Sequence, residues 1–122
     1  MIQKTILNMT LFSSIFGTKA QHNDAIKVLD TQTFKDSISS KKVQLIDVRT
    51  PGEYRLGHIK DAKNIDFFSG NFTTEFNKLN KEKPVYIYCR SGSRSRQTAN
   101  KLSAMGFKEI YDLKGGFIAW SN

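Results

Sequence analysis

Residues 85–95 read Val-Tyr-Ile-Tyr-Cys-Arg-Ser-Gly-Ser-Arg-Ser, and the fold can be worked out from this stretch. Four residues of strong β-propensity end at Cys89, the only cysteine of the chain. A short segment rich in Gly, Ser and Arg follows, and a pattern typical of a helix begins after it. The order strand, turn, helix predicts one unit of a parallel sheet, with Cys89 at the carboxyl end of its strand.

The residues that follow Cys89 favour a reactive thiolate. Turn amides and the positive end of the next helix are expected to converge on the sulfur, and Arg90 and Arg94 add full charges. Such surroundings stabilise the charged form of a thiol, which is the nucleophile. The alternative is that a lone cysteine after an apolar run is a small buried hydrophobic residue. The polar, basic segment after Cys89 favours the nucleophile, because it makes a poor apolar pocket and a good anion site.

Strands and helices alternate along the rest of the chain. Strands are predicted at residues 25–29, 43–48, 64–65, 85–88 and 107–111. Helices are predicted after a cap at Thr31 or Thr33, from Thr50 to Gly57, within 67–79, and before Gly106, with a last segment after the Gly115-Gly116 turn. This alternation predicts an α/β domain with a mainly parallel central sheet and helices on both faces.

Two further polar residues follow the strand at 43–48. Ligands of open α/β sheets bind outside the carboxyl ends of the strands. We therefore expect Asp47 and Arg49 on the same edge as Cys89, as supporting residues. The next residues, Thr50-Pro51-Gly52-Glu53, have the pattern of a capping box that begins a short helix.

Size and composition limit the classes of function. The chain has 122 residues, which suits one domain of the usual size of about 100–150. One cysteine excludes an internal disulfide, and with two histidines it excludes a Cys/His zinc site, so neither a metal nor a cofactor is expected. The net charge of +8 attracts small anions, but the lysines are dispersed and form no run, so no nucleic-acid partner is predicted.

Residues 1–20 differ from the rest of the chain. Residues 1–23 contain no acid, and Lys4 precedes a mildly apolar stretch at 6–16 that is followed by Thr18-Lys19-Ala20. This pattern is similar to a secretory signal peptide cleaved after Ala20; the alternative is a disordered leader on a cytoplasmic protein. The expected location is periplasmic or secreted in the first case. The stretch is shorter than the about 20 residues of a membrane-spanning helix, so no stable membrane anchor is expected.

Three motifs in this order resemble the rhodanese-like domain family. The first is Asp-Val-Arg-Thr-Pro-Gly-Glu-Tyr at 47–54, continued by Gly-His-Ile at 57–59 and Ala-Lys-Asn-Ile at 62–65. The second is the stretch at 85–95, and the third is Leu-Lys-Gly-Gly-Phe at 113–117 with Trp120. The resemblance covers about residues 25–122, nearly the whole chain after the leader, and so implies a single rhodanese-like domain there.

The resemblance also implies a thiosulfate sulfurtransferase. Cys89 matches the family's nucleophile, which accepts a sulfane sulfur as a persulfide and passes it to a thiophilic acceptor. The residues expected to hold the sulfur and its small anionic donor are Arg90, Ser91, Gly92, Ser93, Arg94 and Ser95. Asp47 and Arg49 match an acidic and basic pair with structural and electrostatic roles, and His58 is interpreted as structural. The acceptor is a thiol or cyanide, and a protein persulfide donor or acceptor is a further option.

Two alternatives stay open. Cell-cycle dual-specificity phosphatases and related arsenate reductases resemble rhodaneses, but their loop is one residue longer than the six positions from Cys89 to Arg94. The other alternative is a persulfide carrier or binding module without high turnover. A carrier needs the same residues as an enzyme, whereas the presence of Cys89 argues against an inactive module.

Overall fold

A computed structural model of the protein describes residues 23–121. The leader predicted at residues 1–20 lies outside them, so its nature and the location of the protein stay predictions. Within residues 23–121, no helix is long and apolar enough to cross a membrane.

Five strands form one sheet, in which every pair of neighbours is parallel. The spatial order of the strands is β1-β5-β4-β2-β3. The strands are β1 (Ile26–Leu29), β2 (Gln44–Asp47), β3 (Lys63–Asn64), β4 (Val85–Tyr88) and β5 (Ile110–Leu113). All four residues of the central strand β4 are buried, as expected of a strand covered on both faces.

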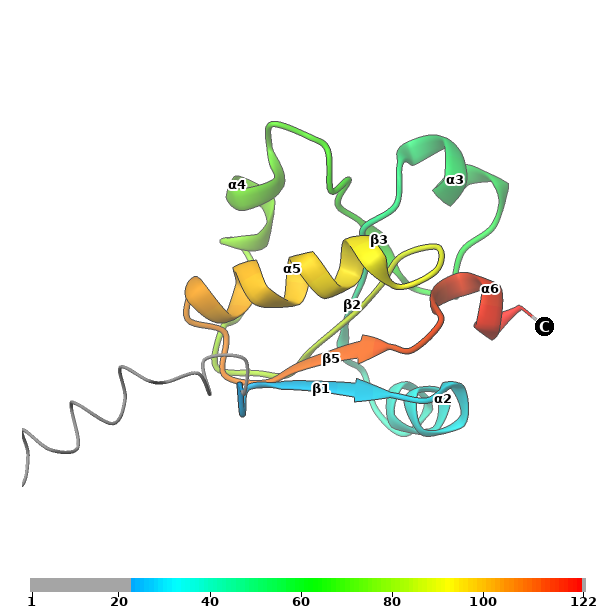
Figure 1. The fold of residues 1–122 in the computed structure, drawn as a ribbon, viewed down its shortest axis with the longest axis horizontal. Helices are drawn as coiled ribbons and strands as arrows, with labels where there is room; N and C mark the ends of the chain where they lie inside the picture. Colours follow the sequence, from blue (N-terminus) through cyan, green and yellow to red (C-terminus); the bar gives the residue numbers. More distant parts are fainter. Residues whose placement is uncertain (1–22, 122) are drawn as a thin grey trace, which may run out of the picture.

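Helices cover both faces of the sheet, which confirms the predicted α/β architecture (Figure 1). The helices are α2 (Thr31–Ser39), α3 (Pro51–Leu56), α4 (Phe72–Phe76), α5 (Ser93–Ala104) and α6 (Gly116–Trp120). Residues of α4 and α5 belong to one apolar cluster, and residues of α2, α3 and α6 pack into the other. Each face of the sheet therefore has its own hydrophobic core, which removes apolar side chains from water.

The strand predicted at 107–111 is wrong at its start, since β5 begins at Ile110. Phe107 instead ends the turn after α5, where its amide donates to the carbonyl of Leu102 at 3.1 Å. Its ring is buried edge-on against Phe76, with ring centroids 6.4 Å apart. Burial of an aromatic ring below α4 thus outweighs the local β-propensity.

The helix caps give one confirmed prediction and one wrong one. The capping box of α3 is present: the Glu53 amide donates to Thr50 Oγ1 at 3.3 Å, and the Thr50 amide donates to Glu53 Oε1 at 3.0 Å. In α2 the cap is Asp30, whose carboxylate accepts from the Thr33 amide at 2.8 Å, and not Thr31 or Thr33. A carboxylate at that position accepts a charge-assisted hydrogen bond, and it also complements the positive end of the helix.

The register of the sheet brings the functional residues together. Asp47 is paired with Tyr88 across β2 and β4, and Ile87 is paired with Asp112 across β4 and β5. The segments that leave these three strands therefore meet at one edge of the sheet. Cys89, Arg49 and the Gly115-Gly116 turn all lie in those segments.

Candidate functional site

Cys89 begins a tight segment that leads from β4 into the first turn of α5, and we call this segment the cysteine loop (residues 89–95). Its side chain is 1% exposed and packs with the apolar cluster on the α5 face of the sheet. On the other side, the amide of Gly92 donates to Cys89 Sγ at 3.1 Å. Gly92 has a φ of 120°, which L residues with a side chain rarely adopt, and this conformation turns the chain back toward the sulfur. The sulfur is thus both buried, as in the apolar alternative, and hydrogen-bonded by the loop.

The first turn of α6 fixes the start of the cysteine loop. The Phe117 amide donates to the Cys89 carbonyl at 2.8 Å, and the Ile118 amide donates to the Arg90 carbonyl at 3.1 Å. In a planar trans peptide unit the N–H points opposite to the C=O. The amides of Arg90 and Ser91 therefore point away from α6, and the orientation of the first two peptide planes after the sulfur is set.

Gly116 allows this contact between α6 and the loop. Its φ is 60°, in the left-handed region, and it is buried. A Cβ at this position would lie 2.5 Å from the Arg90 carbonyl oxygen and 2.6 Å from the Cys89 carbonyl oxygen. The Gly115-Gly116 turn predicted from the sequence is therefore also the point where α6 touches the backbone after Cys89.

Asp47 and Arg49 form a buried ion pair beside the loop. Arg49 Nη2 donates to Asp47 Oδ2 at 2.7 Å and Arg49 Nε donates to Asp47 Oδ1 at 3.0 Å. Arg49 Nη2 also donates to the Gly57 carbonyl at 2.6 Å, and the guanidinium carbon lies 4.4 Å from the ring centroid of Phe117. Arg49 thus joins β2 to the end of α3 and to α6, a geometry that fits the predicted supporting role.

Tyr88 extends this buried network. Its hydroxyl accepts a hydrogen bond from the Ile59 amide at 3.0 Å. Burial, helped by the hydrogen bond to Asp47, raises the pKa of Tyr88 well above its usual value. The phenol therefore stays neutral, and its contacts hold the Gly57-His58-Ile59 turn against the sheet.

Arg94 forms an ion pair that the sequence analysis does not contain. Its Nη1 lies 2.8 Å from Glu53 Oε1 and its Nη2 lies 3.1 Å from Glu53 Oε2. The hydrogen bond from Arg94 is the main cause that lowers the pKa of Glu53 to about 2. The charge of Arg94 is therefore shared with a carboxylate, so its assignment to donor binding stays a prediction. Thr50 and Glu53 show a capping pattern in the sequence, but no local pattern indicates a partner 41 residues away.

Ser95 lies in the first turn of α5, and its predicted part in donor binding stays a prediction. Its side chain is fully buried, and its hydroxyl donates to the Gly92 carbonyl at 3.3 Å. Its hydroxyl is therefore used within the protein and holds the Gly92 carbonyl. Ser95 is a positioning residue for the end of the loop.

Asp112 on β5 is a buried acid that was not predicted from the sequence. It is buried behind the first turn of α5, and burial is the main cause that raises its pKa to about 6, against the lowering effects of Ser95 and Arg96. Arg96 Nε lies 4.0 Å from Asp112 Oδ2. The sequence does contain a signal for this residue, because an acid lies between the apolar residues Ile110 and Leu113, at the end of a predicted strand. A carboxylate buried in this way needs a hydrogen-bond or charge partner.

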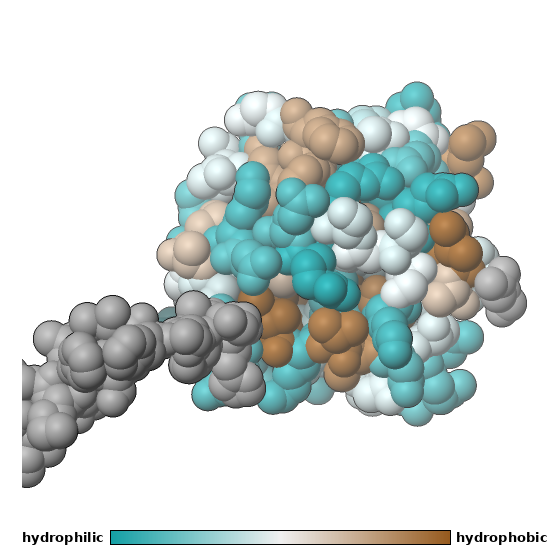
Figure 2. Space-filling model, viewed as in Figure 1, coloured by the Kyte–Doolittle hydropathy of each residue, from teal (hydrophilic) through white to brown (hydrophobic). Residues whose placement is uncertain are grey.

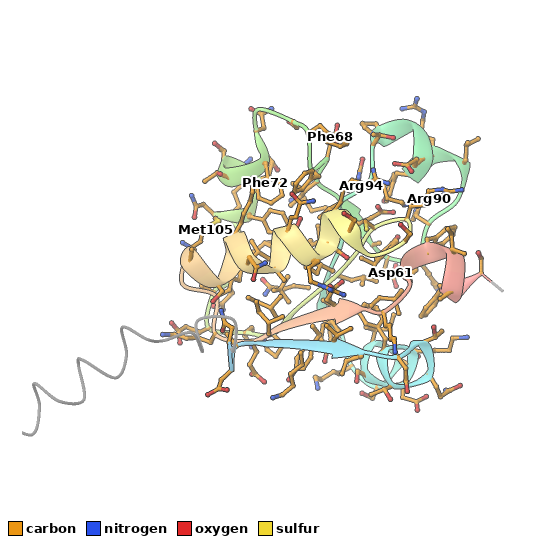
Figure 3. All side chains as sticks on the ribbon, viewed as in Figure 1. Asp61, Phe68, Phe72, Arg90, Arg94 and Met105 are labelled. Atoms are coloured by element: carbon orange, nitrogen blue, oxygen red, sulfur yellow. The ribbon has the colours of Figure 1, made fainter. Side chains whose placement is uncertain are left out.

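The remaining loop side chains surround the mouth of the cysteine loop. Arg90, Ser91 and Ser93 are exposed, and Arg90 and Arg94 lie at the same end of α5, opposite Met105 (Figure 3). One cavity of about 190 Å³ beside the loop is lined by Arg49, Glu53, Leu56, Gly57, Arg90 and Phe117. Another of about 390 Å³ is lined by Ser91, Gly92, Ser93, Arg96, Gln97, Leu113, Lys114 and Gly115. In the part of the chain that the structure covers, no three His, Cys, Asp or Glu side chains are grouped so that they could hold a metal ion.

A family model of the rhodanese-like domain matches residues 30–122. The chain belongs to the rhodanese-like family. A protein named YqhL of Bacillus subtilis is 41% identical over 95 residues, which cover 78% of this chain and 72% of that protein. The thiosulfate sulfurtransferase GlpE of Coxiella burnetii is 36% identical over 83 residues, which cover 68% of this chain and 76% of that protein. The family predicted from the three motifs is confirmed.

The structure of this rhodanese-like domain is also similar to solved ones. The crystal structure of a rhodanese-like domain protein of Staphylococcus aureus matches with a TM-score of 0.69 at 35% identity, and the match covers 77% of this chain and 90% of that chain. A sulfurtransferase of Allochromatium vinosum is 32% identical over 79% of this chain and 89% of that protein. Relatives named as sulfurtransferases thus support that activity at the level of the family.

Membership of the rhodanese-like family does not by itself decide the activity. A tRNA uridine(34) hydroxylase of Pelagibacter ubique is 32% identical over 96% of this chain, but the match covers only 37% of that protein. The activity of this rhodanese-like domain depends on the chemistry of its own loop.

Proposed function

We propose that this protein is a sulfurtransferase that moves a sulfane sulfur from thiosulfate, or a similar anionic donor, to a thiophilic acceptor through a persulfide on Cys89. The observation that carries the proposal is the hydrogen bond of 3.1 Å from the Gly92 amide to Cys89 Sγ. It lies in a loop whose first peptide planes are held by α6. An amide directed at a sulfur stabilises negative charge there without reorganisation. The likeness to a named thiosulfate sulfurtransferase supports the choice of donor.

The first half-reaction loads the sulfur. The Cys89 thiolate attacks the outer sulfur of thiosulfate, the S–S bond of thiosulfate breaks, and sulfite leaves with the bonding electron pair. Arg90, exposed at the mouth of the loop, attracts the dianion and the leaving sulfite. The amide of Gly92 supports the charged sulfur on the enzyme before and after this step.

Arg94 acts mainly through position in this scheme. Its guanidinium is paired with Glu53 at two short distances, so much of its charge is already compensated. The pair connects the cap of α3 to the first turn of α5, in the last part of the cysteine loop. We therefore assign direct donor recognition to Arg90 and a positioning role to Arg94.

The second half-reaction unloads the sulfur. A thiophilic acceptor, cyanide in an assay or a thiol, attacks the outer sulfur of the persulfide, and Cys89 leaves as thiolate. Because the donor's product leaves before the acceptor reacts, the proposed scheme predicts ping-pong kinetics. No step needs a metal or a cofactor.

A persulfide carrier with slow turnover is the second candidate. The observation that favours it is the burial of Cys89: only 1% of the residue is exposed, so reagents in solution have little access to the sulfur. Turnover of thiosulfate with cyanide would favour the enzyme, whereas a single loading event per chain without turnover would favour the carrier. The phosphatase and arsenate reductase alternative has less support, because the loop has the shorter six-residue form.

The experiment that tests the proposal is the loading of Cys89 followed by mass spectrometry. The parent protein treated with thiosulfate should gain the mass of one sulfur atom, and cyanide should remove it. Cys89→Ser should show neither the gain nor the cyanide-dependent rate, because a hydroxyl is not ionised at neutral pH. Val28→Ser is the matched control, since it introduces the same side chain at an exposed position on the edge strand β1, outside the cysteine loop. A mass gain in Cys89→Ser would refute the persulfide assignment.

A further inference from the structure

Exposed apolar side chains gather around the mouth of the cysteine loop. Among residues 23–121, the large hydrophobic side chains that are strongly exposed are Val28 (44%), Leu56 (93%), Phe68 (69%) and Ile118 (40%). Three of these four are next to the loop, and we call Leu56, Phe68 and Ile118 the apolar rim. Exposed apolar groups that cluster around a functional site mark an interaction surface, whereas scattered ones do not.

Each member of the apolar rim has a contact that places it at the loop. Leu56 lines the same cavity as Arg90. The ring centroid of Phe68 lies 5.9 Å from the guanidinium carbon of Arg94. The Ile118 amide donates to the Arg90 carbonyl at 3.1 Å. Figure 2 shows apolar residues over α3 and over α6 with hydrophilic residues between them.

The charge around the apolar rim is mainly positive. Arg55, Arg90 and Lys114 are exposed on α3, on the loop and on the turn before α6. Of the acids next to this surface, Glu53 is paired with Arg94, and Asp66 accepts a hydrogen bond from the Phe68 amide. A partner that complements this surface therefore carries acidic residues beside apolar ones.

The burial of Cys89 limits how a partner reaches the sulfur. Thiosulfate or cyanide is small and gains nothing from a leucine that is 93% exposed. A large partner gains from covering that leucine, but it must present its reacting atom on a slender, protruding segment, because Cys89 is only 1% exposed.

We infer that the apolar rim and its basic residues dock a protein that presents a cysteine thiol on an acidic, apolar segment and takes the sulfur from Cys89. This inference rests on the proposed sulfur transfer and names its acceptor class. The partner's thiolate attacks the outer sulfur of the Cys89 persulfide, and a new S–S bond forms on the partner. The S–S bond to Cys89 breaks, and its electron pair returns to Cys89 as thiolate. No oxidant or reductant is consumed.

The test compares two acceptors on the same persulfide-loaded protein. One is cyanide, and the other is a synthetic peptide whose single cysteine is flanked by aspartates and leucines. A second peptide with lysines in place of the aspartates is the charge control. Leu56→Ser, alone and combined with Phe68→Ser, removes apolar surface from the rim, and Val28→Ser is the matched control on the edge strand β1, since Val28 is also exposed and apolar.

The expected result is a loss specific to the acidic peptide. Leu56→Ser should lower kcat/KM for this peptide about tenfold, which corresponds to about 1.4 kcal/mol of lost binding. The rate with cyanide should stay within about twofold of the parent, since the loop is unchanged and a change this small is under about 0.5 kcal/mol. Val28→Ser should change neither rate, and the lysine peptide should be a poor acceptor for the parent.

Several results would overturn the inference. A parent that uses cyanide but treats both peptides alike, or a rim variant as fast as the parent with the acidic peptide, overturns the inference alone. A parent that transfers sulfur to neither acceptor overturns the proposed function as well. Dimers of the parent that Leu56→Ser converts to monomers in light scattering would assign the rim to a second copy of the chain. Rim-dependent binding to vesicles of anionic phospholipid would assign it to a membrane surface.

Discussion

Substituting Gly116 by alanine tests whether α6 positions the cysteine loop. The added Cβ would lie 2.5 Å from the Arg90 carbonyl oxygen, and an ordinary contact needs 3.4 Å. The helix therefore has to move by roughly 0.5–0.9 Å, because the atoms it meets are backbone and cannot rotate away. That movement weakens the hydrogen bonds from the Phe117 and Ile118 amides.

The cost of Gly116→Ala can be worked out from these contacts. A left-handed φ costs an alanine about 1–2 kcal/mol, and two weakened hydrogen bonds add about 1–2 kcal/mol. We expect the free energy of unfolding to fall by about 2–4 kcal/mol in urea titrations. We also expect the rate of sulfur transfer from thiosulfate to cyanide to fall by up to about 100-fold, because the loop amides shift by a large fraction of an ångström.

Gly70→Ala is the matched control for this substitution. Gly70 is exposed, and nothing lies within 4 Å of a Cβ built on it. Its rate and stability should equal those of the parent. If Gly116→Ala transfers sulfur at the parent rate while it is folded, α6 does not restrain the loop and the reasoning is refuted.

Three further substitutions probe buried and paired charges. The pKa of Asp112 is raised to about 6 from 3.8, so the folded protein binds this proton more tightly than the unfolded chain between these pH values. The free energy of unfolding of the parent should therefore fall by up to about 3 kcal/mol as pH rises from about 4 to 6. In urea titrations of Asp112→Asn this fall should be absent. The pKa of Glu53 is lowered to about 2, so the stabilisation from its carboxylate is present above about pH 4.5 and is lost as pH falls toward 2. Glu53→Gln should lack this acid-dependent loss and should be about 1 kcal/mol less stable than the parent at pH 7. An acid unfolding curve equal to that of the parent would contradict the pairing with Arg94. Arg49→Lys should lower the free energy of unfolding by about 3 kcal/mol in thermal denaturation, since lysine cannot replace the paired hydrogen bonds to buried Asp47; a loss under about 1 kcal/mol would show that the pair is not needed.

The parts of the fold that are encoded locally were predictable from the sequence. The strand that ends at Cys89, the capping box at Thr50 and the helix stop at Gly106 each depend on residues within one turn of each other. The parallel arrangement follows from the alternation of strands and helices. It places Asp47 beside Tyr88, and so the shared edge of the sheet was predictable as well.

The other features depend on contacts between distant segments. The pairing of Glu53 with Arg94 needs α3 and α5 to be packed, and a pattern of helix capping already accounts for Glu53. Ser95 looks like part of a polar loop until the rotation of α5 turns it toward the buried Asp112. The start of β5 was misplaced for the same kind of reason, since the burial of Phe107 is decided by α4.

The bonds from α6 to the loop also have a consequence for dynamics. The Phe117 and Ile118 amides are hydrogen-bonded to the carbonyls of Cys89 and Arg90, so their protons exchange with solvent deuterium only when these hydrogen bonds break. Their hydrogen-exchange protection factors therefore measure how often the cysteine loop separates from α6. This measurement can be made on the protein without any sulfur donor.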